Sequence, residues 1–112
     1  MKTTKIAKEN ISRLNVAIQF IEENLDTKLT LDIIAEKAHF SPFHFHRLFS
    51  LVVKETPNNF INRKRIERAA SSLLHQKEKT ITEVAEAVGF GNLSSFSKAF
   101  KKFYGISPNQ FK

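Results

Sequence analysis

The sequence predicts an all-α protein of about seven helices, built around a duplicated unit of two helices and a turn. Three observations lead to this fold class. Only three glycines and three prolines interrupt the 112 residues, which leaves few places for turns between strands. Apolar residues recur at spacings of three and four, the period of an amphipathic helix. Two segments about fifty residues apart also repeat each other in residue type and register.

The first helix is predicted by an apolar stripe near the N-terminus, made of Ile11, Leu14, Ile18, Ile21 and Leu25. A longer helix is predicted over residues 57–75. It begins at Pro57, which suits a first helical turn. Its stripe consists of Phe60, Ile66, Ala69, Ala70, Leu73 and Leu74. Further along, Thr80 and Glu83 have the spacing of a capping box, which predicts the start of a short helix.

The repeat predicts the remaining helices. The stretch TLDIIAEKAHF at 30–40 matches TITEVAEAVGF at 80–90 with an offset of 50. The stretch FHRLFSLVVKETPNNF at 45–60 matches FSKAFKKFYGISPNQF at 96–111 with an offset of 51, so one residue has been inserted in the turn between the two matches. Agreement in register and residue type over both segments indicates duplication of a unit of roughly 30 residues.

Each unit is predicted to contain a short helix, a brief turn and a second helix. Gly89 suits the left-handed residue that a tight turn between helices often needs, and His39 holds the matching place in the first unit. Ser41 and Asn92 are suited to cap the second helices. This is the helix-turn-helix pattern, present twice.

The stretch FSPFHFHRLF at 40–49 raises the question of a metal site. On a strand, His44 and His46 would share a face. On a helix they point about 200° apart, and no single ion could use both. Strand alternation fails where Leu48 and Phe49 follow each other, so the helix is favoured and no metal site is expected.

If these segments are helical, the second helix of each unit has an apolar face and a polar face. The buried faces are predicted to contain Phe45, Leu48, Phe49 and Val52 in the first unit, and Phe96, Ala99, Phe100 and Phe103 in the second. The outward faces carry Phe43, His46, Arg47 and Ser50, and Ser94, Ser97, Lys98 and Lys101. Such stripes are usually ordinary solvated faces. Here they lie on the element that enters a major groove, and Phe43 is an aromatic side chain on an exposed face.

Composition limits the class of partner. The net charge is +7, and residues 57–112 carry ten basic against four acidic residues (10 − 4 = +6). A basic half suggests a polyanion, nucleic acid before a membrane surface. There is no cysteine, so neither a disulfide nor a Cys-based zinc site is expected, and no cofactor is predicted. The chain lacks a membrane-length apolar run and its start lacks a signal-peptide core, so we expect a cytoplasmic protein.

Three motifs together resemble the DNA-binding domain of AraC/XylS-type transcription regulators, over about residues 12–112: FSPFHFHRLF, RIERAASSLL and ITEVAEAVGFGNLSSFSKAFKKFYGISPNQF. The resemblance implies two helix-turn-helix subdomains, at 10–56 and 76–112, joined by a linker helix at 57–75. It implies that two recognition helices enter successive major grooves of double-stranded DNA. It further implies regulation of promoters, hence RNA polymerase as a partner, and we expect this segment to be a monomer.

The resemblance also implies which residues contact DNA. Base-facing positions are Phe43, His46 and Arg47 in the first subdomain and Asn92, Ser94, Ser97 and Lys98 in the second. Ser50 lies on the same predicted outward face and is also expected to contact DNA. Lys101 and Lys102 suit phosphates. For Arg65 on the linker helix, we favour a structural ion pair over a DNA contact.

The chain departs from the family pattern at Lys54, which stands where Gly105 stands in the second unit, and at Lys98, which replaces a common arginine. Many relatives carry an effector domain. The chain is therefore expected to be either a short regulator or a fragment of a member in which a GyrI-like domain follows.

Two other functions stay open. A non-specific architectural DNA-binding protein would show little preference for sequence. A bundle that binds an acidic protein would not bind DNA at low salt. An enzyme is the least favoured class, because the sequence has no Ser-His-Asp arrangement, Gly-rich phosphate loop or paired acid.

Overall fold

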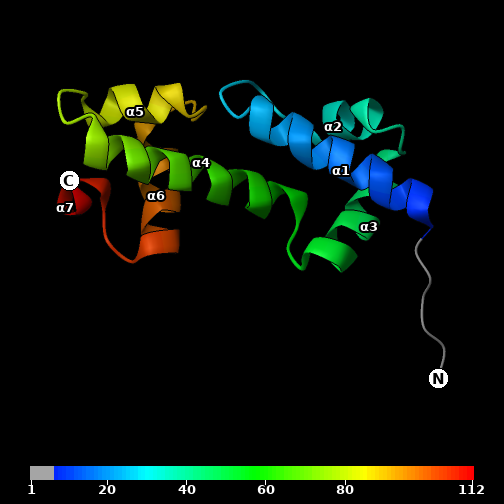
Figure 1. The fold of residues 1–112 in the computed structure, drawn as a ribbon. Helices are drawn as coiled ribbons and strands as arrows, with labels where there is room; N and C mark the ends of the chain where they lie inside the picture. Colours follow the sequence, from blue (N-terminus) through cyan, green and yellow to red (C-terminus); the bar gives the residue numbers. More distant parts are fainter. Residues whose placement is uncertain (1–6) are drawn as a thin grey trace. The chain divides into compact units, whose positions relative to one another are not determined.

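The computed structural model describes residues 7–112, and this part of the chain folds into seven α-helices without a strand (Figure 1). The helices are α1 (Lys8–Glu23), α2 (Leu31–Lys37), α3 (Pro42–Val53), α4 (Pro57–His75), α5 (Ile81–Ala87), α6 (Leu93–Tyr104) and α7 (Pro108–Phe111). The predicted all-α class and helix number are confirmed. Over the same residues, no helix has the combined length and apolar character that a membrane crossing needs.

The helices belong to two compact units. Unit 1 contains α1, α2 and α3, and unit 2 contains α4 from Asn58 onward, α5, α6 and α7. Unit 2 also contains the short segment Leu25–Lys28, which lies between α1 and α2 in the sequence. The sequence placed this segment inside the first subdomain, and the predicted subdomain boundaries stay a prediction.

The duplicated unit is visible in the helix bounds and caps. α5 begins and ends 50 residues after α2, and α6 begins and ends 51 residues after α3, as the two sequence offsets predict. Thr80 and Glu83 form the predicted capping box. The side chain of Ser41 accepts a hydrogen bond from the His44 amide, and that of Asn92 accepts one from the Ser95 amide. Both predicted N-caps are therefore confirmed.

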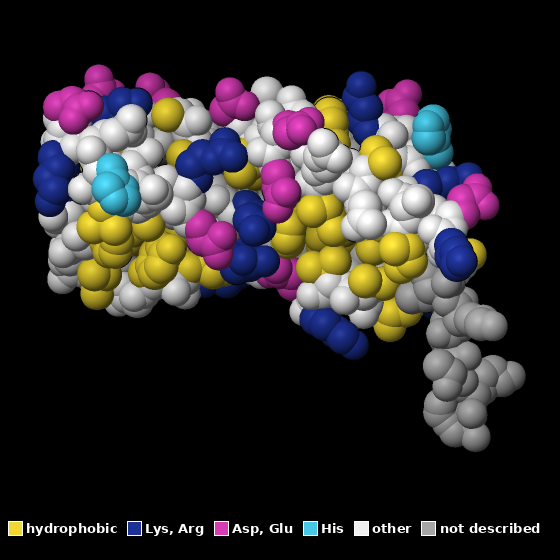
Figure 2. All heavy atoms as spheres, viewed as in Figure 1, with side chains coloured by type: hydrophobic (Ala, Val, Ile, Leu, Met, Phe, Trp, Pro, Cys, Tyr) yellow, Lys and Arg dark blue, Asp and Glu magenta, His cyan; other side chains and the backbone are white. Residues whose placement is uncertain are grey.

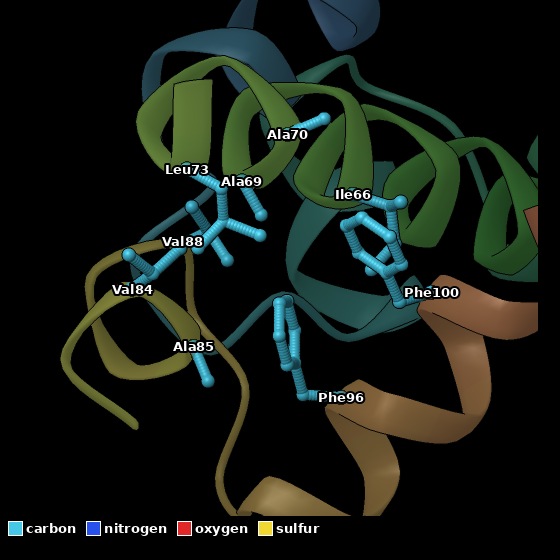
Figure 3. Packing of buried hydrophobic residues seen from close by; sticks show 9 residues of the cluster. All are labelled: Ile66, Ala69, Ala70, Leu73, Val84, Ala85, Val88, Phe96 and Phe100. Atoms are coloured by element: carbon cyan, nitrogen blue, oxygen red, sulfur yellow. The ribbon is translucent and has the colours of Figure 1, made fainter. Parts of the chain in front are cut away.

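Each unit has its own phenylalanine-centred core. Phe45 and Phe49 in unit 1 are fully buried, with ring centroids 5.5 Å apart, and Phe96 and Phe100 in unit 2 are fully buried, 5.8 Å apart. Figure 3 shows the second pair pointing from α6 toward α4. The side chains around that pair are Ile66, Ala69, Ala70, Leu73, Val84, Ala85 and Val88. The second helices are thus held by matching aromatic anchors, as predicted.

Two apolar residues that were expected to be buried are exposed. Ile11 on α1 keeps 37% of its surface, and Leu74 on α4 keeps 51%. Each helix turns by about 100° per residue, which places both residues roughly 90° from the centre of the buried stripe on their helix. Ile11 and Leu74 therefore mark the edges of their stripes, where packing against a neighbouring helix ends.

Candidate nucleic-acid interface

Helix α3 presents an exposed group of side chains at its N-terminal end. Phe43 keeps 72% of its surface, and His46 and Arg47 are also exposed. The Arg47 guanidinium lies over the Phe43 ring, with its central carbon 5.9 Å from the ring centroid. Such a stacked cation is held in a limited set of positions without losing its hydrogen-bond donors. Phe43, His46 and Arg47 therefore form one accessible surface opposite the buried Phe45 and Phe49.

Ser50 is less accessible than the three residues of this surface. Its Oγ atom is buried and has no hydrogen-bond partner among the described residues. The sequence placed Ser50 on the outward face, three residues after Arg47. The residue as a whole is half-buried, and its hydroxyl oxygen points away from solvent. Contact of Ser50 with DNA stays a prediction.

The two histidines of this stretch have separate surroundings. The ring of His44 packs edge-on against Phe40, with centroids 5.3 Å apart at an interplanar angle of 80°. His46 is exposed on the face of Phe43 and Arg47. This divergence follows from helical geometry, as the sequence predicted.

Helix α6 presents the corresponding surface of unit 2. Ser94, Lys98 and Lys101 are exposed, and Ser97 is half-buried. The side-chain oxygen of Asn92 lies 2.7 Å from the Ser95 amide nitrogen and caps the helix. This bond uses one of the two lone pairs of the Asn92 amide oxygen, and its NH₂ group keeps two hydrogen-bond donors.

Two features border the α6 surface. The Lys102 ammonium donates to the side-chain oxygen of Asn59 at 3.1 Å and lies 5.4 Å from the Phe103 ring centroid. A shallow hollow of about 320 Å³ adjoins Ser97, with polar groups contributed by Thr80, Thr82, Asn109 and Lys112. Thr82, Asn109 and Lys112 were not among the residues predicted from the sequence. They come from two separate segments, α5 and the end of the chain at α7, and no local pattern joins these segments.

Several basic side chains of α4 form ion pairs or ring contacts within unit 2. Arg63 pairs with Glu67 at 2.9 Å, and the guanidinium lies 5.4 Å from the Phe60 ring centroid. On the face shown in Figure 2, Lys and Arg side chains alternate with Asp and Glu and do not gather in one patch. Charge alone therefore does not mark an interface on this face. Lys98 and Lys101 are exposed on α6.

Arg65 on α4 is bound within unit 2 by hydrogen bonds to the backbone. Its Nε donates to the carbonyl oxygen of Leu25 at 2.9 Å, and its second terminal nitrogen donates to that of Thr27 at 2.7 Å. Burial lowers the pKa of the Arg65 guanidinium, and the charge of Asp26 acts in the opposite direction. The expected structural ion pair is thus replaced by two hydrogen bonds to backbone carbonyls, with Asp26 contributing at longer range.

A family model described as a helix-turn-helix domain matches residues 34–112. The probable transcriptional regulator LumQ of Photobacterium leiognathi is 31% identical over 106 residues, covering 93% of this chain and 42% of that protein. The chain therefore spans about two fifths of the length of this relative.

Solved structures share the fold. The C-terminal domain of AraT, a response regulator from Geobacillus stearothermophilus, has a TM-score of 0.83 and 32% identity, covering 96% of this chain and 86% of that one. The DNA-binding domain of the global transcriptional factor AdpA, solved in complex with a target DNA, has a TM-score of 0.81 and covers 88% of each chain. At 23% identity, the likeness to AdpA shows the fold alone.

Proposed function

Because the chain belongs to the AraC-type helix-turn-helix family, we propose that it is the DNA-binding segment of a transcription regulator, and that α3 and α6 enter successive major grooves. The observation that carries this proposal is the duplication. Two equivalent second helices are each capped at the N-terminus, anchored by a pair of fully buried phenylalanines, and exposed along the opposite polar face.

The surface of α3 supports direct reading of bases. An arginine can donate two hydrogen bonds to one guanine, and an aromatic ring can pack against the methyl group of thymine. Arg47 and Phe43 offer these two groups side by side, with the guanidinium already over the ring. His46 adds a ring that can donate or accept. We assign base contacts in unit 1 to these three residues.

The surface of α6 supports weaker discrimination between bases. Ser94 and Ser97 can bond to many base edges, and Lys98 has a point charge where an arginine would offer a planar fork. Lys101, exposed, and Lys102, held near Asn59, fit phosphate oxygens better than bases. Asn92 would contribute its NH₂ group. Unit 2 would therefore add affinity and register more than sequence preference.

The wider assignments follow from family membership. Double-stranded DNA is the proposed ligand and RNA polymerase the proposed protein partner, with this segment acting as a monomer in the cytoplasm. The transcriptional regulators among the relatives favour a regulator over an enzyme. The subdomain boundaries at 10–56, 57–75 and 76–112 are part of the same proposal.

Selection of bound sequences from a random DNA pool tests the function. The wild type should enrich a site with two base-specific positions about one helical turn apart, roughly 10–10.5 base pairs. Arg47→Ala should weaken the preferred site by about 1–3 kcal/mol and relax the preference at one guanine. Lys8→Ala, an exposed basic residue on α1, is the matched control and should leave the enriched site unchanged.

Other outcomes separate the alternatives. If Arg47→Ala weakens all sequences equally, Arg47 contacts a phosphate and the base assignment fails. If the wild type binds all sequences with equal affinity, the protein is a non-specific architectural DNA-binding protein and not a sequence-specific regulator. Failure to bind any DNA at low salt would favour an acidic protein partner.

A further inference from the structure

The hollow beside Ser97 is lined by side chains that can donate hydrogen bonds to an anion. It lies within unit 2 and has a volume of about 320 Å³. Its polar lining consists of Thr80 and Thr82 at the start of α5, Ser97 on α6, and Asn109 and Lys112 in and after α7. Lys112 is the only charged residue among the described residues that line the hollow, so the charge of the lining is positive and suits an anion.

Two of these donors are fixed by their neighbours and still have hydrogens to donate. The Lys112 ammonium donates to the backbone oxygen of Lys79 at 2.9 Å, and an ammonium has three donors, so two remain. The Thr80 hydroxyl oxygen accepts from the Glu83 amide at 3.0 Å, which leaves the hydroxyl hydrogen to donate. The Glu83 carboxylate accepts from the Thr80 amide at 2.8 Å and is thereby tied to the helix cap. An anion in the hollow would therefore meet donors that are already held in position.

The hollow adjoins the surface of α6 that is proposed to enter a major groove. Ser97 belongs to that surface and also lines the hollow. A helix with its side chains is about 10–12 Å wide, and the major groove is about 12 Å wide. A helix in the groove therefore has a sugar–phosphate backbone along each side. Polar groups directly beside such a helix meet phosphates before they meet bases.

The first copy of the repeat does not have the two residues that matter most. At the offset of 50, the counterpart of Thr82 is Asp32, whose negative charge would repel a phosphate. One residue past the match at the offset of 51, the counterpart of Lys112 is Ile61, which is buried. The duplicated fold therefore does not itself require a threonine and a lysine at these places, and they are features of the second copy alone.

We propose that the hollow seats one phosphate group of the DNA backbone beside the groove that α6 enters, with Lys112 as its charged contact and Thr82 and Asn109 as neutral ones. The proposal rests on the proposed function. A contact of this kind fixes the register of α6 on the DNA and adds affinity without reading a base.

Replacing single phosphates of the selected DNA site by methylphosphonates tests the seat, because a methylphosphonate is uncharged and nearly the same size. In the wild type, one replacement beside the position that Lys98 reads should weaken binding by roughly three- to tenfold. Lys112→Gln should weaken binding to unmodified DNA by a similar factor for all sequences and lower the salt slope by about one unit. The same methylphosphonate should then cause no further loss.

Two changes at Thr82 cover a failure of Lys112→Gln to fold. Thr82→Val keeps the shape of the side chain and removes the hydroxyl, so it should weaken binding and reduce the effect of that methylphosphonate. Thr82→Asp copies the charge of Asp32 and should weaken binding more. For Thr82→Asp, the methylphosphonate at this position should bind better than the phosphate, because the repulsion is removed. Lys77→Gln, an exposed basic residue outside the hollow, is the matched control and should keep the full wild-type effect.

If every methylphosphonate effect of the wild type persists in Lys112→Gln and Thr82→Asp, no backbone phosphate occupies the hollow and the proposal is overturned. Sequence selection by the wild type would then leave the proposed function intact. If the wild type selects no sequence, the proposed function fails and the seat fails with it. A third outcome assigns the hollow to free phosphate instead of the backbone: inorganic phosphate at constant ionic strength shifts the amide signals of Thr82 and Asn109, and no methylphosphonate effect depends on Lys112.

Discussion

Replacing Lys54 by glycine should stabilise the protein. Lys54 ends α3 with φ 71° and ψ 22°, and its amide donates to the Ser50 carbonyl oxygen. Gly105 ends α6 in the same way, with φ 79° and ψ −7°. The left-handed conformation costs a non-glycine residue about 1–2 kcal/mol. Glycine loses about 0.5–1 kcal/mol more backbone entropy on folding. The difference predicts that Lys54→Gly raises the free energy of unfolding by up to about 1.5 kcal/mol.

The reciprocal change isolates the backbone effect. A Cβ atom added at Gly105 meets nothing within 4 Å, so Gly105→Ala should cost about 1 kcal/mol through conformation alone. Lys54→Ala is the control, because it removes the side chain and keeps the strain. Urea denaturation should show shifted midpoints with an unchanged slope. Equal stabilities of Lys54→Gly and Lys54→Ala, or a loss in Lys54→Gly, would refute the assignment of strain to this cap.

Four further changes test the packing and the interface. Phe96→Ala should lower the free energy of unfolding by about 3–5 kcal/mol in chemical denaturation, and a loss under about 1 kcal/mol would contradict its place in the core. Ser50→Ala should be neutral or stabilising by about 1 kcal/mol in the same assay, because it removes a buried hydroxyl without a partner. Lys101→Gln should reduce the salt dependence of DNA binding by about one unit of slope, equally for all sequences. His46→Gln should weaken the base preference of unit 1 in binding-site selection, because the proposal assigns a base contact to His46.

The helices were predictable because their ends are determined by residues close together in the sequence. Thr80 with Glu83 and Asn92 place helix starts by short-range hydrogen bonds that depend on a few neighbouring residues. Pro57 likewise stands at the first residue of α4. The errors at Ile11 and Leu74 have a common cause. Periodicity gives the direction of a stripe but not its width, which is set by the neighbouring helices.

The candidate site was predictable in its faces and less so in its details. Exposure of Phe43, Arg47 and Lys98 follows from helical phase relative to the phenylalanine anchors. Burial of the Ser50 hydroxyl does not follow from helical phase, because Ser50 is three residues after Arg47 and was placed on the same face. The partners of Arg65 are 38 and 40 residues away in sequence, so no local pattern could have distinguished backbone carbonyls from an ion pair.

The prediction of a glycine turn at Gly89 was correct, but backbone conformation is only one of two reasons why glycine is needed there. The sequence assigned glycine there to a left-handed turn, and φ is indeed 100°. His39 occupies the equivalent turn with φ 62°, which a non-glycine residue can adopt at some cost, whereas 100° at Gly89 lies beyond that region. The stricter requirement is space, because the Leu25 oxygen lies where a Cβ atom of residue 89 would be. The two turns are therefore not interchangeable. His39→Gly would change only the local strain of its own turn, whereas Gly89→His would have to displace Leu25–Lys28 from unit 2 before the turn could form.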